Sequence, residues 1–261
     1  MARFEPNPER RGAIVTGASS GIGRAVAIAL AAAGHPVVIG SRNVAALEEV
    51  VDLIVAEGGS AAAVHLDLAD PASPARFAAA ATEILGDVEI LISNAAHNQV
   101  GAVLDMTSEE LSHVLSVNLE GTHRLVRSVV PAMVSRRRGD VVIVTSDVVA
   151  RPRPTMAAYV TSKWSLEGYA RALQMEMEGT GVRATVVRPG PTLTSMGFDW
   201  DPEITGKVIE EWTRWGFGRH SNFMRPDGVA QAVAAVIELP RGVNVSTIEL
   251  QPEAPINKEA P

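Results

Sequence analysis

The chain has 261 residues, of which 46% are apolar and 20% charged, so a disordered or fibrous protein is excluded. It contains no cysteine, which excludes disulfides, thiolate metal sites and a cysteine nucleophile. Its 23 basic and 30 acidic side chains give a net charge of −7, and because an acidic protein repels phosphate backbones we expect no nucleic acid partner.

Short apolar runs alternate with amphipathic segments along the chain. The apolar runs predict strands at residues 13–16, 36–41, 62–66, 88–93, 141–145, 183–187 and 247–250. Segments with helical spacing predict helices at residues 22–33, 45–57, 74–85, 108–135, 157–178 and 227–237. This order predicts an α/β fold: a single-domain, Rossmann-like, doubly wound parallel sheet with helices on both faces, formed by residues 1–261.

The segment 190–225 has no clear periodicity and is too long for an ordinary connection. We expect it to be an irregular substrate loop at the carboxyl edge of the sheet. Six aromatic residues fall in it, between Met196 and Met224: Phe198, Trp200, Trp212, Trp215, Phe217 and Phe223. One hypothesis is that these rings form an apolar lid over a hydrophobic substrate. The alternative is that they pack against a neighbouring subunit or under the loop.

The sequence gives no sign of membrane insertion or secretion. No run reaches the roughly 18 to 20 unbroken apolar residues that a membrane-spanning helix needs. Residues 1–11 carry Glu5, Pro6, Pro8 and Glu9 before any apolar run, which is unlike a signal peptide. We therefore expect a cytoplasmic protein with no membrane partner.

Residues 16–23 read Thr-Gly-Ala-Ser-Ser-Gly-Ile-Gly and lie between the first predicted strand and the first predicted helix. Glycines in such a turn let the backbone approach a pyrophosphate, whose charge the amino terminus of the helix favours. The turn is therefore predicted to bind a nucleotide through Gly17, Ser19, Ser20, Gly21, Ile22 and Gly23.

The end of the second predicted strand bears on the choice of cofactor. Proteins that bind NAD usually place an acid there for the ribose hydroxyls, but this strand ends with Ser41 and Arg42. A guanidinium suits a 2′-phosphate, so we expect NADP(H) to be preferred over NAD(H). The alternative for Arg42 is a solvated arginine at a strand end.

Tyr159 and Lys163 lie four residues apart on a predicted helix and so share a face. A lysine ammonium near a phenol stabilises the phenolate and lowers its pKa, which gives a proton donor usable near neutral pH. Ser146 ends the preceding strand and can meet that face. By itself the Tyr/Lys spacing is common and mostly structural, so Ser146 strengthens the prediction of a catalytic site.

The sequence resembles the short-chain dehydrogenase/reductase family, of the Tyr-x-x-x-Lys type, over nearly its whole length. Four motifs occur in the order and spacing of that family. They are the turn at 16–23, Asn94-Ala95-Ala96, Asn118, and Ser146 with Tyr159-Val160-Thr161-Ser162-Lys163. A fifth is Pro189-Gly190 with Thr192 and Thr194.

The resemblance implies a role for each of these residues. Tyr159 would be the general acid or base, and Lys163 would bind the nicotinamide ribose and depress the Tyr159 pKa. Ser146 would polarise the substrate carbonyl, and Asn118 would help to hold a proton-relay water. The cofactor would contact the glycine turn, Ser41, Arg42, Asp67, Leu68, Asn94, Ala95, Ala96, Tyr159, Lys163, Pro189, Gly190, Thr192 and Thr194.

Two departures from the family pattern stand out. Ala96 replaces a glycine near the cofactor, and the glycine-rich ending Val-Asp-Gly-Gly of many members is absent, which weakens any assignment to fatty-acid synthesis. The resemblance implies an NADP(H)-dependent oxidoreductase that acts on a hydrophobic ketone or secondary alcohol, as a homodimer or homotetramer. The alternative is a nucleotide-binding scaffold that acts as a sensor or interaction protein without turnover. We expect no metal site, because His65, His113 and His123 lack the spacing of metal ligands.

Overall fold

The computed structural model describes residues 7, 10–195, 202–215, 220 and 222–256. Its seven strands form one parallel sheet in the order β3-β2-β1-β4-β5-β6-β7. The strands are β1 (Gly12–Thr16), β2 (Val37–Ser41), β3 (Ala61–His65), β4 (Val88–Ser93), β5 (Gly139–Val144), β6 (Val182–Pro189) and β7 (Thr247–Leu250). The order reverses between β1 and β4, which confirms the predicted doubly wound α/β fold.

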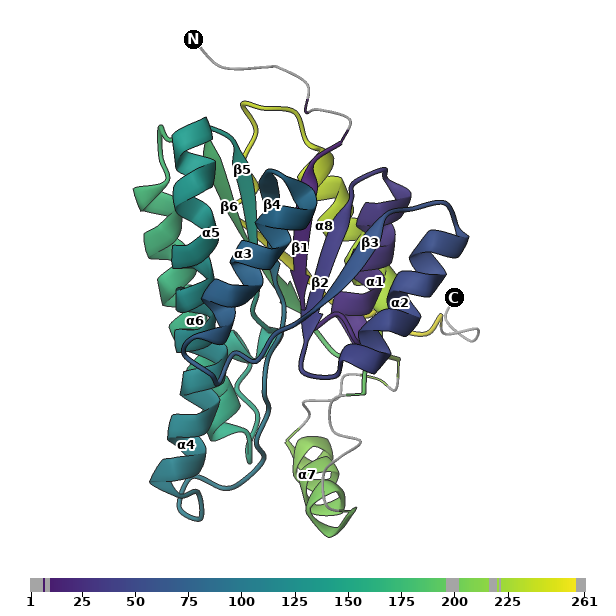
Figure 1. Cartoon of the computed structure of the whole chain (residues 1–261). Coiled ribbons are helices and arrows are strands. Elements are labelled where there is room, and N and C mark those ends of the chain that lie inside the picture. Colours follow the sequence, from purple (N-terminus) through teal and green to yellow (C-terminus); the bar gives the residue numbers. More distant parts are fainter. Residues whose placement is uncertain (1–6, 8–9, 196–201, 216–219, 221, 257–261) are drawn as a thin grey trace.

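Helices cover both faces of this sheet (Figure 1). One face packs against α1 (Gly21–Ala32), α2 (Val44–Ala56) and α8 (Pro226–Glu238). The other packs against α3 (Ser73–Leu85), α5 (Thr122–Arg136) and α6 (Ala157–Glu176). Successive strand residues enter opposite cores, as Val15 and Ile14 of β1 do, and this burial on both faces explains the continuous apolar runs. In the described part of the chain, every helix is too short or too polar to cross a bilayer.

The long helix predicted at 108–135 is divided in the structure. It consists of α4 (Ser108–Leu115), a π-helical segment (Ser116–Gly121) and α5. Asn118 lies in the π-helical segment and is fully buried. At Gly121, a Cβ atom would lie 2.6 Å from the Cβ of Leu68, so the close approach of these segments requires glycine. Such widened turns are frequent at functional sites.

The expectation of an irregular segment at 190–225 is wrong for its central part, which forms α7 (Pro202–Arg214). Figure 1 shows α7 beyond the carboxyl ends of the strands, at the same end of the molecule as α4. The four-residue spacing of Ile204, Val208 and Trp212 is helical, and Val208 is buried. The predicted aromatic residues Phe198, Trp200 and Phe217, together with Met196, lie outside the described residues.

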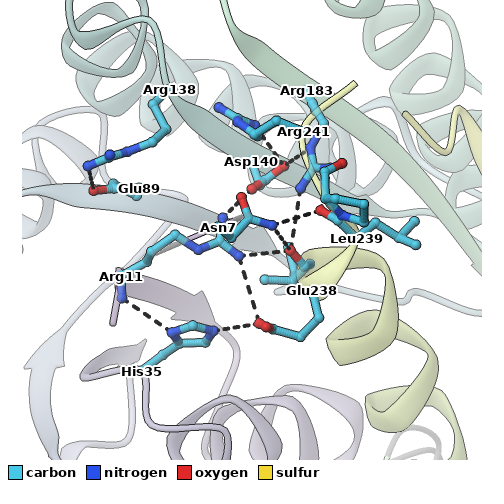
Figure 2. A network of polar contacts seen from close by, with 12 residues as sticks. Asn7, Arg11, His35, Glu89, Arg138, Asp140, Arg183, Glu238, Leu239 and Arg241 are labelled. Atoms are coloured by element: carbon cyan, nitrogen blue, oxygen red, sulfur yellow. Dashed lines mark hydrogen bonds and ion pairs between the residues drawn. The ribbon is translucent and has the colours of Figure 1, made fainter. Parts of the chain in front are cut away.

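A network of charged side chains links the segments at the amino ends of the strands (Figure 2). Asp140, at the start of β5, accepts from Arg11 at 2.5 Å and from Arg183 at 2.6 Å, and Arg241 lies 3.9 Å away. Arg11 is fully buried and also donates to the carbonyl of Ile237 in α8. The network lies at the edge opposite the carboxyl ends of the strands and joins β5, β6, α8 and the segment before β1.

Candidate active site

A cleft of about 1830 Å3 opens at the carboxyl ends of the strands. Segments that follow all seven strands form its walls together with α7, in the region where parallel sheets bind ligands. Of the site residues expected from the sequence, Gly23 and Asn118 lie outside these walls. The others line the cleft: Gly17, Ser19, Ser20, Gly21, Ile22, Ser41, Arg42, Asp67, Leu68, Asn94, Ala95, Ala96, Ser146, Tyr159, Lys163, Pro189, Gly190, Thr192 and Thr194.

The glycine turn is shaped to receive a pyrophosphate. Gly17 and Gly21 have φ angles of 67° and 53°, in the left-handed region that favours glycine. A Cβ on Gly23 would lie 2.4 Å from the carbonyl oxygen of Gly17, so Gly23 serves close packing rather than the cleft wall. The α1 helix begins directly after Ser20, whose side chain does not cap it. Its first N–H groups are therefore available to an anion, and the turn fits a dinucleotide.

Asn94 joins this turn to the end of β4. Its Nδ2 donates to the carbonyl oxygen of Thr16 at 2.9 Å, and the backbone N–H groups of Asn94 and Ala95 both donate to Thr16 Oγ1 at 3.0 Å. Ala96 packs against the cluster of Val148, Met156 and Tyr159, so its methyl group lies in the cleft wall near the candidate catalytic residues. The motif at 94–96 thus supports the floor of the cleft between β1 and β4.

The end of β2 carries no acid that faces the cleft. Ser41 Oγ donates to the carbonyl oxygen of Asn43 at 3.2 Å, and Asn43 caps α2. Arg42 lines the cleft, is exposed and forms no ion pair within the described part of the chain. Asp67, after β3, accepts from the backbone N–H of Ala69 at 2.9 Å. Arg42 is therefore the residue here that is suited to an additional phosphate.

Ser146, Tyr159 and Lys163 lie together at the bottom of the cleft. Ser146 begins the turn after β5, and α6 carries the other two side chains on one face. Ser146 lies close enough to Tyr159 to lower the pKa of its phenol. Lys163 Nζ donates to the carbonyl oxygen of Val144 at 2.8 Å and lies 5.5 Å from the centre of the Tyr159 ring. The structure thus brings together the side chains that the sequence predicted to meet.

Burial dominates the protonation of this pair. It raises the pKa of Tyr159 to about 12, against the smaller lowering effect of Ser146. It also lowers the pKa of Lys163 to about 7. The expected lowering of the Tyr159 pKa by Lys163 is not present in this structure, because burial disfavours both charged forms. Tyr159 therefore holds its proton at neutral pH.

The family model described as short chain dehydrogenase matches residues 11–204, which include the glycine turn, Ser146, Tyr159 and Lys163. The chain belongs to the short-chain dehydrogenase/reductase family. This confirms the resemblance seen in the sequence.

Individual relatives agree with this assignment. A glycine betaine reductase of Emericella nidulans is 33% identical over 241 residues, which make up 92% of this chain and 18% of that protein. The structure of an alcohol dehydrogenase from the archaeon Thermococcus sibiricus, complexed with 5-hydroxy-NADP, gives a TM-score of 0.82 at 29% identity, covering 96% of this chain and 100% of that chain. The structure of a 3-oxoacyl (acyl-carrier-protein) reductase from Agrobacterium tumefaciens, with NADP bound, gives a TM-score of 0.80 at 27% identity. The match covers 95% of this chain and 94% of that chain.

In this short-chain dehydrogenase the amide of Asn118 is buried and is not part of the cleft walls. Its Oδ1 accepts from the backbone N–H of His97 at 2.7 Å. Its Nδ2 donates to the carbonyl oxygen of His97 and to Ser162 Oγ, both at 2.8 Å. With both ends of the amide occupied, the side chain supports the loop after β4. A relay water at Asn118 stays a prediction.

Sequence reasoning missed a polar group on the substrate side of the dehydrogenase cleft. Asp147, directly after Ser146, forms an ion pair of 2.8 Å with Arg153, whose guanidinium lies over the ring of Trp212. Asp147 is buried, and this burial raises its pKa against the attraction of Arg153. In the sequence, the position of Asp147 next to Ser146 was one available signal for this group. The helical spacing that includes Trp212 was another.

Proposed function

We propose that this protein is an NADP(H)-dependent reductase that transfers a hydride to a hydrophobic ketone and, in reverse, oxidises the secondary alcohol. One observation carries the proposal. A single cleft joins the glycine turn and Arg42 at one end to the hydroxyl groups of Ser146 and Tyr159 at the other. A dinucleotide laid along it would bring its nicotinamide to these hydroxyl groups.

The preference for NADP rests on the end of β2. Ser41 stands where an acid would hold the ribose hydroxyls of NAD, and the exposed guanidinium of Arg42 is free to pair with a 2′-phosphate. Two structural relatives hold NADP or 5-hydroxy-NADP, which supports the same choice. Lys163, whose pKa is lowered to about 7, would regain its charge beside an anionic cofactor.

The bound nicotinamide supplies the hydride, and the protein supplies orientation and a proton. During reduction, negative charge develops on the carbonyl oxygen, and the hydroxyl groups of Ser146 and Tyr159 are placed to stabilise it. Tyr159 then donates its phenolic proton to that oxygen. Because its pKa of about 12 keeps the phenol protonated at neutral pH, the site favours reduction of the carbonyl under these conditions.

The substrate side of the cleft carries an apolar wall formed by Met156, Leu193, Ile209, Trp212, Trp215 and Phe223, beside polar groups that include Asp147, Arg153 and Thr213. We assign residues 190–225 to substrate binding, with α7 as their helical part. Aromatic and aliphatic walls with a few polar groups favour a hydrophobic substrate.

The loss of NADPH fluorescence in the presence of a panel of bulky hydrophobic ketones tests this proposal, because the fluorescence disappears as NADPH is oxidised. We expect turnover with NADPH and much slower turnover with NADH at the same concentration. Tyr159→Phe is the matched control, because it removes the proton and keeps the ring. Tight NADPH binding without turnover, over the ketones and the corresponding alcohols, would instead support the sensor alternative.

A further inference from the structure

We infer that Arg153 is a positioning residue that holds α7 over the substrate side of the cleft, by an ion pair with Asp147 and by stacking on Trp212. The inference deepens the proposed function, since it concerns the wall that would contact the substrate. Neither residue of the ion pair takes part in the hydride or proton transfer proposed above.

The first half of the contact fixes Arg153 to the sheet. Its Nη2 donates to Asp147 Oδ2 at 2.8 Å, and the two side chains are only 12% and 4% exposed. Asp147 lies in the 3-10 turn 147–149 that follows β5, next to the candidate catalytic Ser146. A nearly buried, charge-assisted hydrogen bond has a defined geometry, so the guanidinium has a fixed position beside the cleft.

The second half reaches α7. The guanidinium carbon of Arg153 lies 5.4 Å from the centre of the Trp212 ring, within the range of a cation–π contact. The indole N–H of Trp212 donates to the carbonyl oxygen of Pro154 at 3.2 Å. The same ring packs against the cluster of Val148, Met156 and Tyr159. Residues 153 and 154 therefore contact both the face of the Trp212 ring and its indole N–H.

Most other described side chains of α7 are exposed to solvent. Ile209 of α7 is 56% exposed, and Trp215, directly after the helix, is 65% exposed. Val208 is buried and is an additional contact. Because large apolar side chains of the helix remain exposed, loss of the Trp212 contact should release α7 without unfolding the sheet.

Charge near Tyr159 decides which variants are informative. The groups that face this phenol are Lys163 from its own helix, Asp147 from the turn after β5, and Arg153 from the loop before α6. Arg153 lowers the Tyr159 pKa, and Asp147 raises it. A single substitution of either residue therefore leaves an uncompensated charge near the phenol, whereas Asp147→Asn with Arg153→Gln removes both charges together.

Hydrogen exchange of the α7 amides tests the inference without any substrate. In Arg153→Gln and in the double variant, amides of residues 203–214 should exchange roughly tenfold faster, while those of β1, β4 and β5 keep their protection. In Arg153→Lys, the exchange rate of the α7 amides should lie between those of the native protein and Arg153→Gln, because an ammonium still pairs with Asp147 but has no planar face to stack. Arg151→Gln is the matched control: this exposed arginine lines the same cleft, and its loss should leave α7 exchange unchanged.

Unchanged α7 exchange in a folded double variant, or equal acceleration in Arg151→Gln, would overturn the inference. Faster exchange throughout the sheet of Arg153→Gln, with normal α7 protection in the double variant, would assign Arg153 to global stability and would also overturn it. The readout is independent of turnover, so failure of the proposed reaction leaves this test intact. Where a ketone is reduced, Arg153→Lys should raise its KM severalfold with a smaller effect on kcat and no change in the KM for NADPH.

Discussion

The amide of Asn118 pairs with the backbone of His97 in both directions, accepting at 2.7 Å and donating at 2.8 Å. This pair joins the π-helical segment to the loop that leaves β4. A regular helix would not place Asn118 in the same way, because the wider turn rotates the following residues relative to the preceding ones. The pair therefore links a local departure from α-helix to the position of residues 94–98 in the cleft wall.

Asn118→Ala should destabilise the protein by about 1 to 3 kcal/mol, because two backbone groups of His97 and the hydroxyl of Ser162 lose a buried partner. Urea unfolding measures the change. Asn98→Ala is the matched control, since the amide atoms of Asn98 are buried without a hydrogen-bond partner in the described structure and its removal should cost little. Equal losses in the two variants would show that the His97 contacts carry no special weight.

Tyr159→Phe should lower turnover by roughly 10² to 10⁴ while the fold and cofactor binding survive, because the proton donor is lost and the ring remains. Ser146→Ala should reduce kcat more than it weakens binding, since its hydroxyl acts on charge that develops in the transition state. Steady-state kinetics and NADPH titration separate these effects. Near-normal turnover by Tyr159→Phe would remove it from the proton-transfer role.

Arg42→Asn together with Ser41→Asp should reverse the cofactor preference. A charge-assisted contact with the 2′-phosphate contributes about 1.5 to 3 kcal/mol, so the native protein should bind NADPH roughly tenfold to a hundredfold more tightly than NADH. Fluorescence titration with both cofactors measures the ratio. Arg151→Gln, another exposed arginine of the cleft wall, should leave the ratio unchanged. Tighter binding of NADH by the native protein would contradict the prediction.

Local patterns were enough to predict the sheet and the helix face that carries Tyr159 and Lys163. Strand runs buried on both faces and a four-residue helical spacing are periodic signals, and each needs only neighbouring residues to be recognised. The π-helical segment could not be predicted in this way, since it depends on a contact between Asn118 and His97, which are distant in sequence. The same holds for Trp212, whose place is fixed by Arg153 and Pro154.

The environment of Lys163 predicts a specific dependence of stability on pH. Burial lowers its folded-state pKa from 10.5 to about 7, so between pH 7 and 10 the unfolded chain binds more protons than the folded one. The contribution of Lys163 to the free energy of unfolding therefore rises with pH in that window, by up to about 1.4 kcal/mol per pH unit. Lys163→Met should be more stable than the native protein at pH 7, and the difference should shrink toward pH 10. A difference that stays constant with pH would contradict the assigned cause.

Asp140→Asn should be strongly destabilising, because this carboxylate is shared by Arg11 and Arg183 at the buried amino edge of the sheet (Figure 2). Removal of one partner from a buried ion pair typically costs about 3 to 5 kcal/mol, since the remaining charges stay desolvated. Asp70→Asn is the matched control: its pair with Arg76 is exposed and screened, so its loss should change the urea midpoint little. The folded fraction of Asp140→Asn should still bind NADPH with native affinity, because the cleft lies at the other end of the strands. Similar midpoints for the two variants, or weakened NADPH binding by folded Asp140→Asn, would show that this network does not act as a purely structural anchor.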